Sequence, residues 1–84
     1  MTGKPLMPLA LAPTGTTVRV VSVEGGQGVR KRLADLGLTV SECLFVIQSD
    51  ERAPVLLGIK DSRLAIGRGL AFKILVETSS PAIE

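Results

Sequence analysis

One short amphipathic segment stands out in a chain whose other apolar residues favour strands. Val29, Leu33 and Leu36 lie at positions i, i+4 and i+7, which places them on one face of a helix. Gly37 follows directly, where a left-handed C-terminal cap is expected, because glycine adopts that conformation without a Cβ clash. The spacing therefore predicts a helix over residues 29–36 that ends at Gly37. A single short helix in a small β-protein restricts the fold to few possibilities.

The remaining segments are predicted to be strands joined by short turns. β-Branched residues dominate 16–23, where the apolar phase shifts between Val20 and Val21 and indicates either a bulge or burial on both faces. Further strands are expected at 42–49, 55–60, 63–66 and 71–77, with an extended piece at 9–11, a turn at Asp61-Ser62 and a helical turn near 67–69. Five short strands in 84 residues are too few for a sandwich. They predict a mainly β, partly open small barrel, with the helix inserted after the first long strand.

Two of the expected strands are apolar on both faces. In one of them Cys43, Phe45 and Ile47 alternate with Leu44 and Val46. A small barrel has one interior, so one of these two sets must point outward. Either the helix and the N-terminal piece cover the outer set, or part of it contacts another protein. Cys43 is the only cysteine, which excludes an internal disulfide, and we expect it to be a buried small hydrophobe.

The residue types that the chain lacks argue against catalysis, metal binding and nucleic-acid binding. The chain has no histidine, which is the commonest general base and transition-metal ligand. Phe45 and Phe72 are the only aromatic residues, whereas single-strand nucleic-acid platforms depend on exposed rings. The net charge of +2 is too small to indicate a nucleic-acid partner. We therefore expect no catalytic residues, no cofactor, no tight metal site and no nucleic-acid partner.

Charged residues occupy the predicted helix outside its apolar face. Lys31 and Asp35 lie one turn apart, where an ion pair can form, and Arg30 and Arg32 flank Lys31. Such residues either solvate the helix or contact a partner. We select Arg30, Lys31, Arg32 and Asp35 as the candidate partner-binding residues. No apolar run approaches the roughly 20 residues needed to cross a bilayer, so we expect a cytoplasmic protein.

The order of motifs over residues 8–77 resembles the FeoA family, the small cytoplasmic component of bacterial ferrous-iron uptake. The most specific part is 32–38, which follows the family pattern R-L-x-x-L-G-hydrophobic. Ala53-Pro54-Val55, Leu64-Ala65-Ile66-Gly67 and a closing A-x-x-I-x-V pattern at 71–76 also match. The chain departs from the family at Ser41, close to where the family usually has a glycine.

The resemblance implies an SH3-like barrel over residues 8–77, and we expect flexible tails at 1–7 and 78–84. It also implies a partner, the cytoplasmic domain of the FeoB membrane transporter, and membrane contact only through that partner. The implied activity is accessory and non-enzymatic. The same SH3-like fold occurs at the C-terminus of iron-dependent repressors. No DNA-binding helix-turn-helix or dimerisation domain precedes it here, so we do not expect a repressor fragment. Two alternatives stay open: a self-associating module that forms a homo-oligomer, and a small-barrel nucleic-acid binder.

Overall fold

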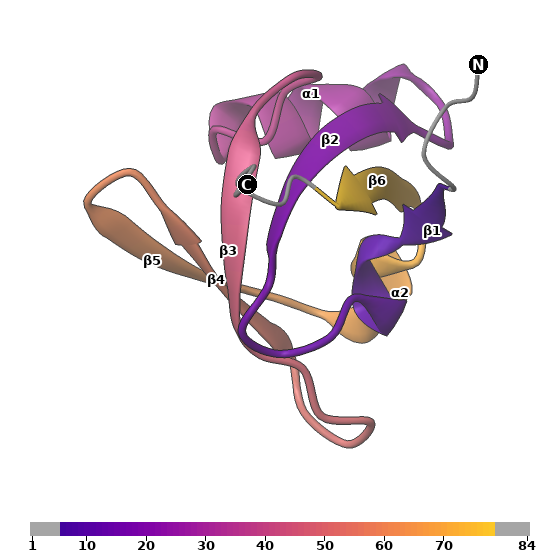
Figure 1. The fold of residues 1–84 in the computed structure, drawn as a ribbon. Helices are drawn as coiled ribbons and strands as arrows, with labels where there is room; N and C mark the ends of the chain where they lie inside the picture. Colours follow the sequence, from indigo (N-terminus) through magenta and orange to yellow (C-terminus); the bar gives the residue numbers. More distant parts are fainter. Residues whose placement is uncertain (1–5, 79–84) are drawn as a thin grey trace, which may run out of the picture.

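A curled antiparallel sheet carries one longer helix and two short helical turns (Figure 1). The computed structural model describes residues 6–78, so most of the two predicted tails lies outside it. The elements in chain order are β1 (Met7–Pro8), the 3-10 helix η1 (Leu9–Leu11), β2 (Thr17–Val23), α1 (Gln27–Asp35), β3 (Cys43–Gln48), β4 (Val55–Ile59), β5 (Ser62–Ile66), α2 (Arg68–Ala71) and β6 (Ile74–Thr78). Met7 and Thr78, expected at the inner ends of the tails, are therefore strand residues.

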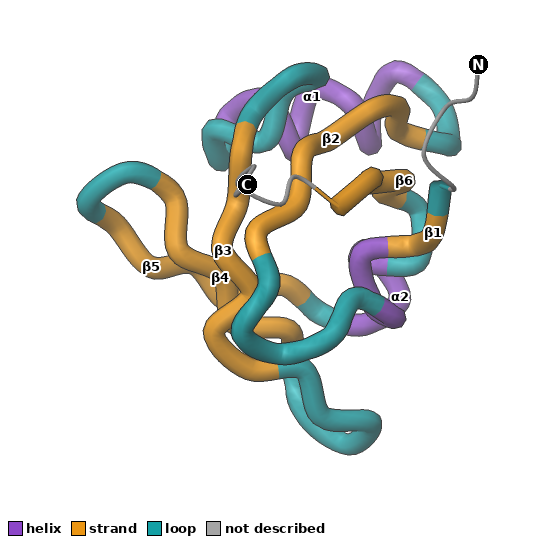
Figure 2. Tube along the Cα trace, viewed as in Figure 1, coloured by secondary structure: helices purple, strands orange, loops and turns teal. Residues whose placement is uncertain are grey.

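The sheet has the strand order β1-β6-β2-β3-β4-β5, and every described pairing is antiparallel. Its strands curl around an aliphatic core, while most of the loops lie at the ends of the strands (Figure 2). The mainly β prediction and the insertion of α1 after the first long strand are confirmed. The five predicted strands are all present, and β1 adds a sixth at one edge.

Three local predictions were wrong. Residues 9–11 form a 3-10 turn rather than an extended piece, with the Ala12 N–H donating to the Leu9 carbonyl at 3.0 Å. The last strand begins at Ile74 rather than residue 71, because α2 occupies residues 68–71. The hairpin turn lies at Lys60-Asp61, one residue early, since Ile59 pairs with Ser62.

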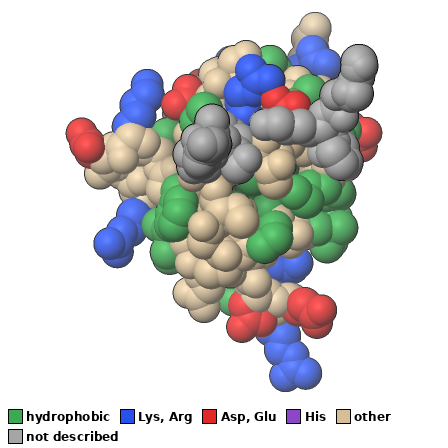
Figure 3. Space-filling model, in the orientation of Figure 1, with side chains coloured by type: hydrophobic (Ala, Val, Ile, Leu, Met, Phe, Trp, Pro, Cys, Tyr) green, Lys and Arg blue, Asp and Glu red, His purple; other side chains and the backbone are tan. Residues whose placement is uncertain are grey.

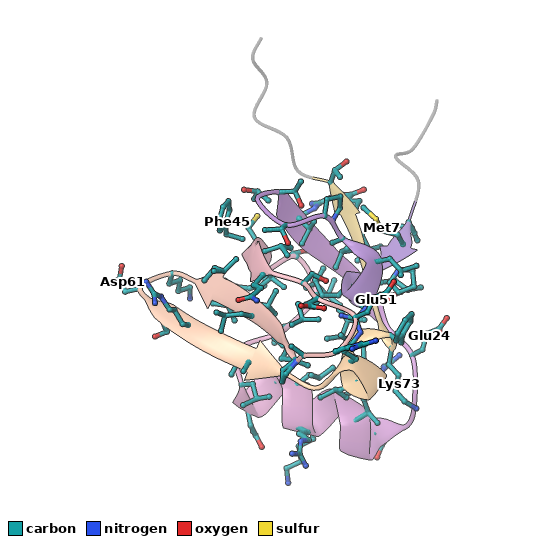
Figure 4. All side chains as sticks on the ribbon, turned by 90° about the horizontal axis from the view of Figure 1, so that it is seen from below. Met7, Glu24, Phe45, Glu51, Asp61 and Lys73 are labelled. Carbon is teal, nitrogen blue, oxygen red and sulfur yellow. The ribbon has the colours of Figure 1, made fainter. Side chains whose placement is uncertain are left out.

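The core is aliphatic, and among residues 6–78 no polar side chain is buried. In β3 the inward set is Leu44 and Val46, which are at most 1% exposed. The outward set includes Cys43, which is exposed, so the prediction of a buried cysteine was wrong. Phe45 lies beside it with 46% of its surface exposed and points away from the sheet (Figure 4). Neither α1 nor the N-terminal piece covers this part of the outer face.

Helix α1 ends in the left-handed cap that was predicted at Gly37. Gly37 has φ +89° and its N–H donates to the Ala34 carbonyl, while the Leu38 N–H donates to the Leu33 carbonyl at 2.8 Å. These two bonds form a Schellman motif, and Leu33 and Leu38 are both buried, which supplies its usual apolar contact. Leu36, expected in the core, is 39% exposed because it is the C-cap rather than a residue of the helical face.

The start of α1 is two residues earlier than predicted. The helix begins at Gln27, and its N-cap, Gly26, makes no side-chain capping bond. Gly25 before it has φ +119°, a conformation that favours glycine, and a Cβ there would lie 3.2 Å from a methyl carbon of Val29. Backbone conformation rather than a capping side chain therefore sets the entry into the helix.

Candidate interaction surface

An apolar groove of about 460 Å³ lies between α1, the second half of β2 and the segment that follows α1. Carbon atoms of aliphatic side chains supply most of its wall, and Arg30 supplies a charge. The residues that line it are Val21, Ser22, Val23, Arg30, Ala34, Leu38, Thr39 and Val40. The groove is formed by three segments that are separate in the sequence, so folding alone brings them together.

A β-bulge supplies one wall of the groove. Val20 pairs with Val76 in β6 and Ser22 pairs with Leu75, so Val21 is an extra residue in β2. Of the two alternatives that the apolar phase shift left open, a bulge or burial on both faces, the structure shows the bulge. Val20, before the bulge, lies in the core, whereas the extra residue Val21 and the two that follow it, Ser22 and Val23, all line the groove.

The segment after α1 supplies the opposite wall. The Schellman motif directs Leu38 into the core and leaves Val40 with 59% of its surface exposed. Ser41 has φ +78°, and its N–H donates to the Val20 carbonyl at 2.7 Å, which fastens the segment to β2. The departure from the resembled pattern at Ser41 therefore leaves the turn intact, with serine in a left-handed conformation.

Helix α1 supplies the charged rim. Arg30 and Ala34 are one turn apart and both line the groove. Successive helical residues are about 100° apart, so Lys31 and Asp35 lie on the solvent side and Arg32 lies on the flank opposite Arg30. All four predicted partner-binding residues are exposed, but the structure places only Arg30 at the groove.

Lys31 and Asp35, whose spacing allows an ion pair, do not form one. Among residues 6–78 the salt bridge is instead Arg19–Glu77, which joins β2 to β6. The hydrogen bond that the Arg19 guanidinium donates to the Glu77 carboxylate raises the pKa of Arg19 above its ordinary value. Arg19 therefore stays charged throughout the physiological range, and this pair is a link within the sheet.

The apolar members of the groove were not selected from the sequence. Val21 and Val23 could be recognised as part of a strand with a phase shift, but not as the wall of a site. Val40 offers the clearest signal, because it is an apolar β-branched residue in the segment between the helix and the next strand. Nothing in the sequence alone shows that these residues face the Arg30 side of α1.

A second cavity of about 460 Å³ lies near η1 and α2. Arg68 in its wall donates from Nη1 to the Asp50 carbonyl at 2.7 Å and from Nη2 to the Ala10 carbonyl at 3.0 Å. Its guanidinium also lies 5.8 Å from the centroid of the Phe72 ring. Because main-chain carbonyls already occupy two guanidinium nitrogens, Arg68 acts here as a link between η1, the β3–β4 loop and α2.

Charged side chains of both signs lie mostly around the margin of the face shown in Figure 3, with apolar surface between them. Within residues 6–78, no three His, Cys, Asp or Glu side chains come together as a group that could hold a metal ion. No described helix is both long enough and apolar enough to cross a membrane.

Comparison with known proteins relates the whole described fold to one family. The FeoA domain family matches residues 7–78. A curated protein of Methanocaldococcus jannaschii named Fe(2+) transport protein A is 42% identical over 72 residues, which cover 86% of this chain and 87% of the relative. A crystal structure described as the iron uptake regulatory protein FeoA has a TM-score of 0.81 and 31% identity, and the match covers 88% of this chain and 97% of that chain.

The same fold occurs in a manganese-dependent transcriptional repressor. The TM-score is again 0.81, but the identity is 19%, and the match covers 92% of this chain and only 44% of the repressor. Similarity at this identity shows the fold alone. The SH3-like architecture implied by the sequence resemblance is confirmed by the FeoA structure. With a family match over residues 7–78 and a 42% identical relative of nearly the same length, this chain belongs to the FeoA family of proteins involved in Fe(2+) transport.

Proposed function

We propose that this chain is a non-enzymatic accessory protein of ferrous-iron uptake that docks on the cytoplasmic domain of the FeoB transporter. Its membership of the FeoA family supports the link to iron transport, and the M. jannaschii relative is named for Fe(2+) transport. In this proposal the protein acts in the cytoplasm and reaches the membrane only through its partner. It binds no cofactor and holds no tight metal site of its own.

The groove beside α1 is the observation that carries the proposal. Aliphatic side chains line an open depression, and Val40 at its margin is 59% exposed. Binding energy at protein interfaces concentrates where an apolar side chain enters such a site and loses its contact with water. We infer that the groove receives an apolar side chain of the transporter domain.

Arg30 gives the groove a means of selecting its partner. Arg30 lines the groove, so its guanidinium can pair with an acidic residue beside the inserted side chain. Lys31, Arg32 and Asp35 lie on the other exposed sides of α1, and we assign them to the margin of the same docking surface. Charges at a margin affect the association rate and its salt dependence more than the affinity.

Binding alone does not explain regulation. A bound protein changes the conformational equilibrium of its partner only if its affinity differs between the two conformations. We therefore propose that the groove binds one nucleotide-dependent conformation of the FeoB cytoplasmic domain better than the other. The rate of transport then depends on the fraction of transporter molecules that have this protein bound.

The proposal is tested by calorimetric titration of the full chain against the FeoB cytoplasmic domain and against the whole transporter. Val40→Asp places a charge at the margin of the apolar groove, and Arg30→Glu reverses the charge at the rim. Each is expected to weaken binding by about tenfold or more. Arg52→Glu is the matched control, because it reverses an exposed charge in the β3–β4 loop, which does not line the groove, and its expected change is less than about threefold.

Two outcomes would contradict the proposal. One is the absence of binding to both the isolated domain and the whole transporter at high micromolar concentration. The other is binding that Val40→Asp and Arg30→Glu leave as strong as in the unmodified chain. Circular dichroism of each variant confirms that a loss of binding is not a loss of folding.

A further inference from the structure

We propose that β5 pairs with β5 of a second copy, so that two chains join their sheets edge to edge across a twofold axis at Leu64. The inference concerns a surface other than the groove, and its test does not depend on whether the protein docks on a transporter. It is carried by the backbone geometry of the β4–β5 hairpin, because that geometry fixes which groups of the edge strand are free.

The outer edge of β5 has no partner strand among residues 6–78. β5 is the last strand of the sheet order and pairs only with β4. The hairpin projects from the rest of the chain, with Asp61 at its tip (Figures 1 and 4). The strand contains no proline and no bulge, and Arg63 is its only charge, so few of the usual protections of an edge strand are present.

The register of the hairpin identifies the free backbone groups. The two-residue turn at Lys60-Asp61 makes Ile59 and Ser62 a hydrogen-bonded pair, and the pairing continues to Val55 and Ile66 without a shift. Hydrogen-bonded and non-hydrogen-bonded pairs alternate in an antiparallel ladder. Arg63 and Ala65 therefore belong to non-hydrogen-bonded pairs with β4, and their N–H and C=O groups point outward.

These free groups are self-complementary. In an antiparallel pair centred on Leu64, Arg63 of each copy lies opposite Ala65 of the other, and each such pair exchanges both of its N–H···O bonds. No Arg63 then faces another arginine directly. Leu64 faces Leu64 of the second copy in a non-hydrogen-bonded pair, the closer type, in which side chains are in contact.

The side chains at the proposed axis favour a second copy over an unrelated strand. Leu64 is only partly buried and packs against the margin of the core, so a second Leu64 extends the core across the axis. Ala65 is small and exposed, which leaves room for the opposite arginine. Because one five-residue strand buries little surface, the dimer is expected to be weak and to depend on concentration.

Sedimentation equilibrium of the full chain over a range of concentrations tests the pairing. Ala65→Pro removes an N–H that β4 does not use, so the monomer is expected to keep its fold while dimerisation weakens by about tenfold or more. Ala65→Ser is the matched control, since it retains the N–H, and it is expected to dimerise as the unmodified chain does. A chain that stays monomeric at millimolar concentration, or a dimer that Ala65→Pro does not weaken, overturns the proposal.

A crosslinking experiment remains decisive if Ala65→Pro does not fold. In a Cys43→Ser background, Leu64→Cys places two thiols opposite each other at the axis, and mild oxidation is expected to give a covalent dimer. Arg63→Cys in the same background is the control, because its thiol faces Ala65 rather than a second thiol. Equal crosslinking of both variants, or no crosslinking of Leu64→Cys, contradicts the proposed axis.

Discussion

Ser41 adopts a backbone conformation that suits glycine better than serine. Its φ of +78° is in the left-handed region, which costs a residue with a Cβ roughly 1–2 kcal/mol. Ser41→Gly is expected to raise the free energy of unfolding by less than about 1 kcal/mol, because the greater freedom of glycine in the unfolded chain offsets part of the relief. Urea denaturation measures the change.

A β-branched residue at the same position gives the opposite result. Ser41→Val is expected to lower the free energy of unfolding by about 1–2 kcal/mol, since its branched side chain is poorly accommodated at positive φ. The Ser41 side chain is exposed, so neither substitution changes the core. Equal destabilisation by Gly and Val would show that the serine side chain, rather than the backbone conformation, matters here.

The buried face of β3 and the exposure of Leu36 could not be predicted from the sequence. The period-two alternation in β3 correctly separates Cys43 and Phe45 from Leu44 and Val46, but it does not say which set points inward. Packing decides this, because the set that meets the opposite side of the curled sheet becomes the core. Leu36 was misplaced for a related reason: helical spacing assigned it to the buried face, whereas the helix had already ended.

Arg68 links three elements that the sheet does not hold together. Its guanidinium donates to the Ala10 carbonyl at the end of η1 and to the Asp50 carbonyl in the β3–β4 loop. Arg68→Lys is expected to lower the free energy of unfolding by about 1–3 kcal/mol, because an ammonium cannot reproduce the forked geometry of the two bonds. Thermal unfolding of the variant measures the loss.

The control for Arg68→Lys is Arg52→Lys. Arg52 is an exposed residue of the same β3–β4 loop, and only its backbone N–H bonds, to the Asp50 carboxylate. The control is expected to change stability by less than about 0.5 kcal/mol. If the two variants are equally stable, Arg68 does not link these elements in solution.

Element boundaries were predictable where periodicity is long enough to be read. β2, β3, β4 and the end of α1 follow from alternation, β-branched residues and a capping glycine. The two-residue strand β1 and the turn η1 are too short to show a period. They form because β6 offers a pairing edge to Met7 and Pro8, which is a tertiary effect that no local pattern reports.

At the scale of the whole molecule, the fold was predictable and the groove was not. Strand count and one inserted helix predicted a small, partly open barrel, the resemblance to the family implied that it is SH3-like, and the structure has that architecture. The groove depends on a bulge in β2 and on the path taken after Gly37, which join segments far apart in sequence. Of the charged residues chosen from α1, only Arg30 therefore lies at the groove.

The two proposed surfaces belong to different parts of the molecule (Figure 1). The groove lies between β2 and α1, and the free edge lies on the projecting β4–β5 hairpin. A dimer joined through β5 therefore leaves the groove of each copy available to a transporter domain. The effect of variants at one surface is expected to be independent of variants at the other.

Chemical-shift mapping of the isotope-labelled chain during titration with the FeoB cytoplasmic domain tests the docking surface most directly. The account predicts that the largest changes in backbone amide shifts fall at 21–23, 30, 34 and 38–40, with small changes at the Lys60-Asp61 tip. Changes concentrated around Arg68 or along β5, or no change at a saturating concentration of the domain, would contradict it.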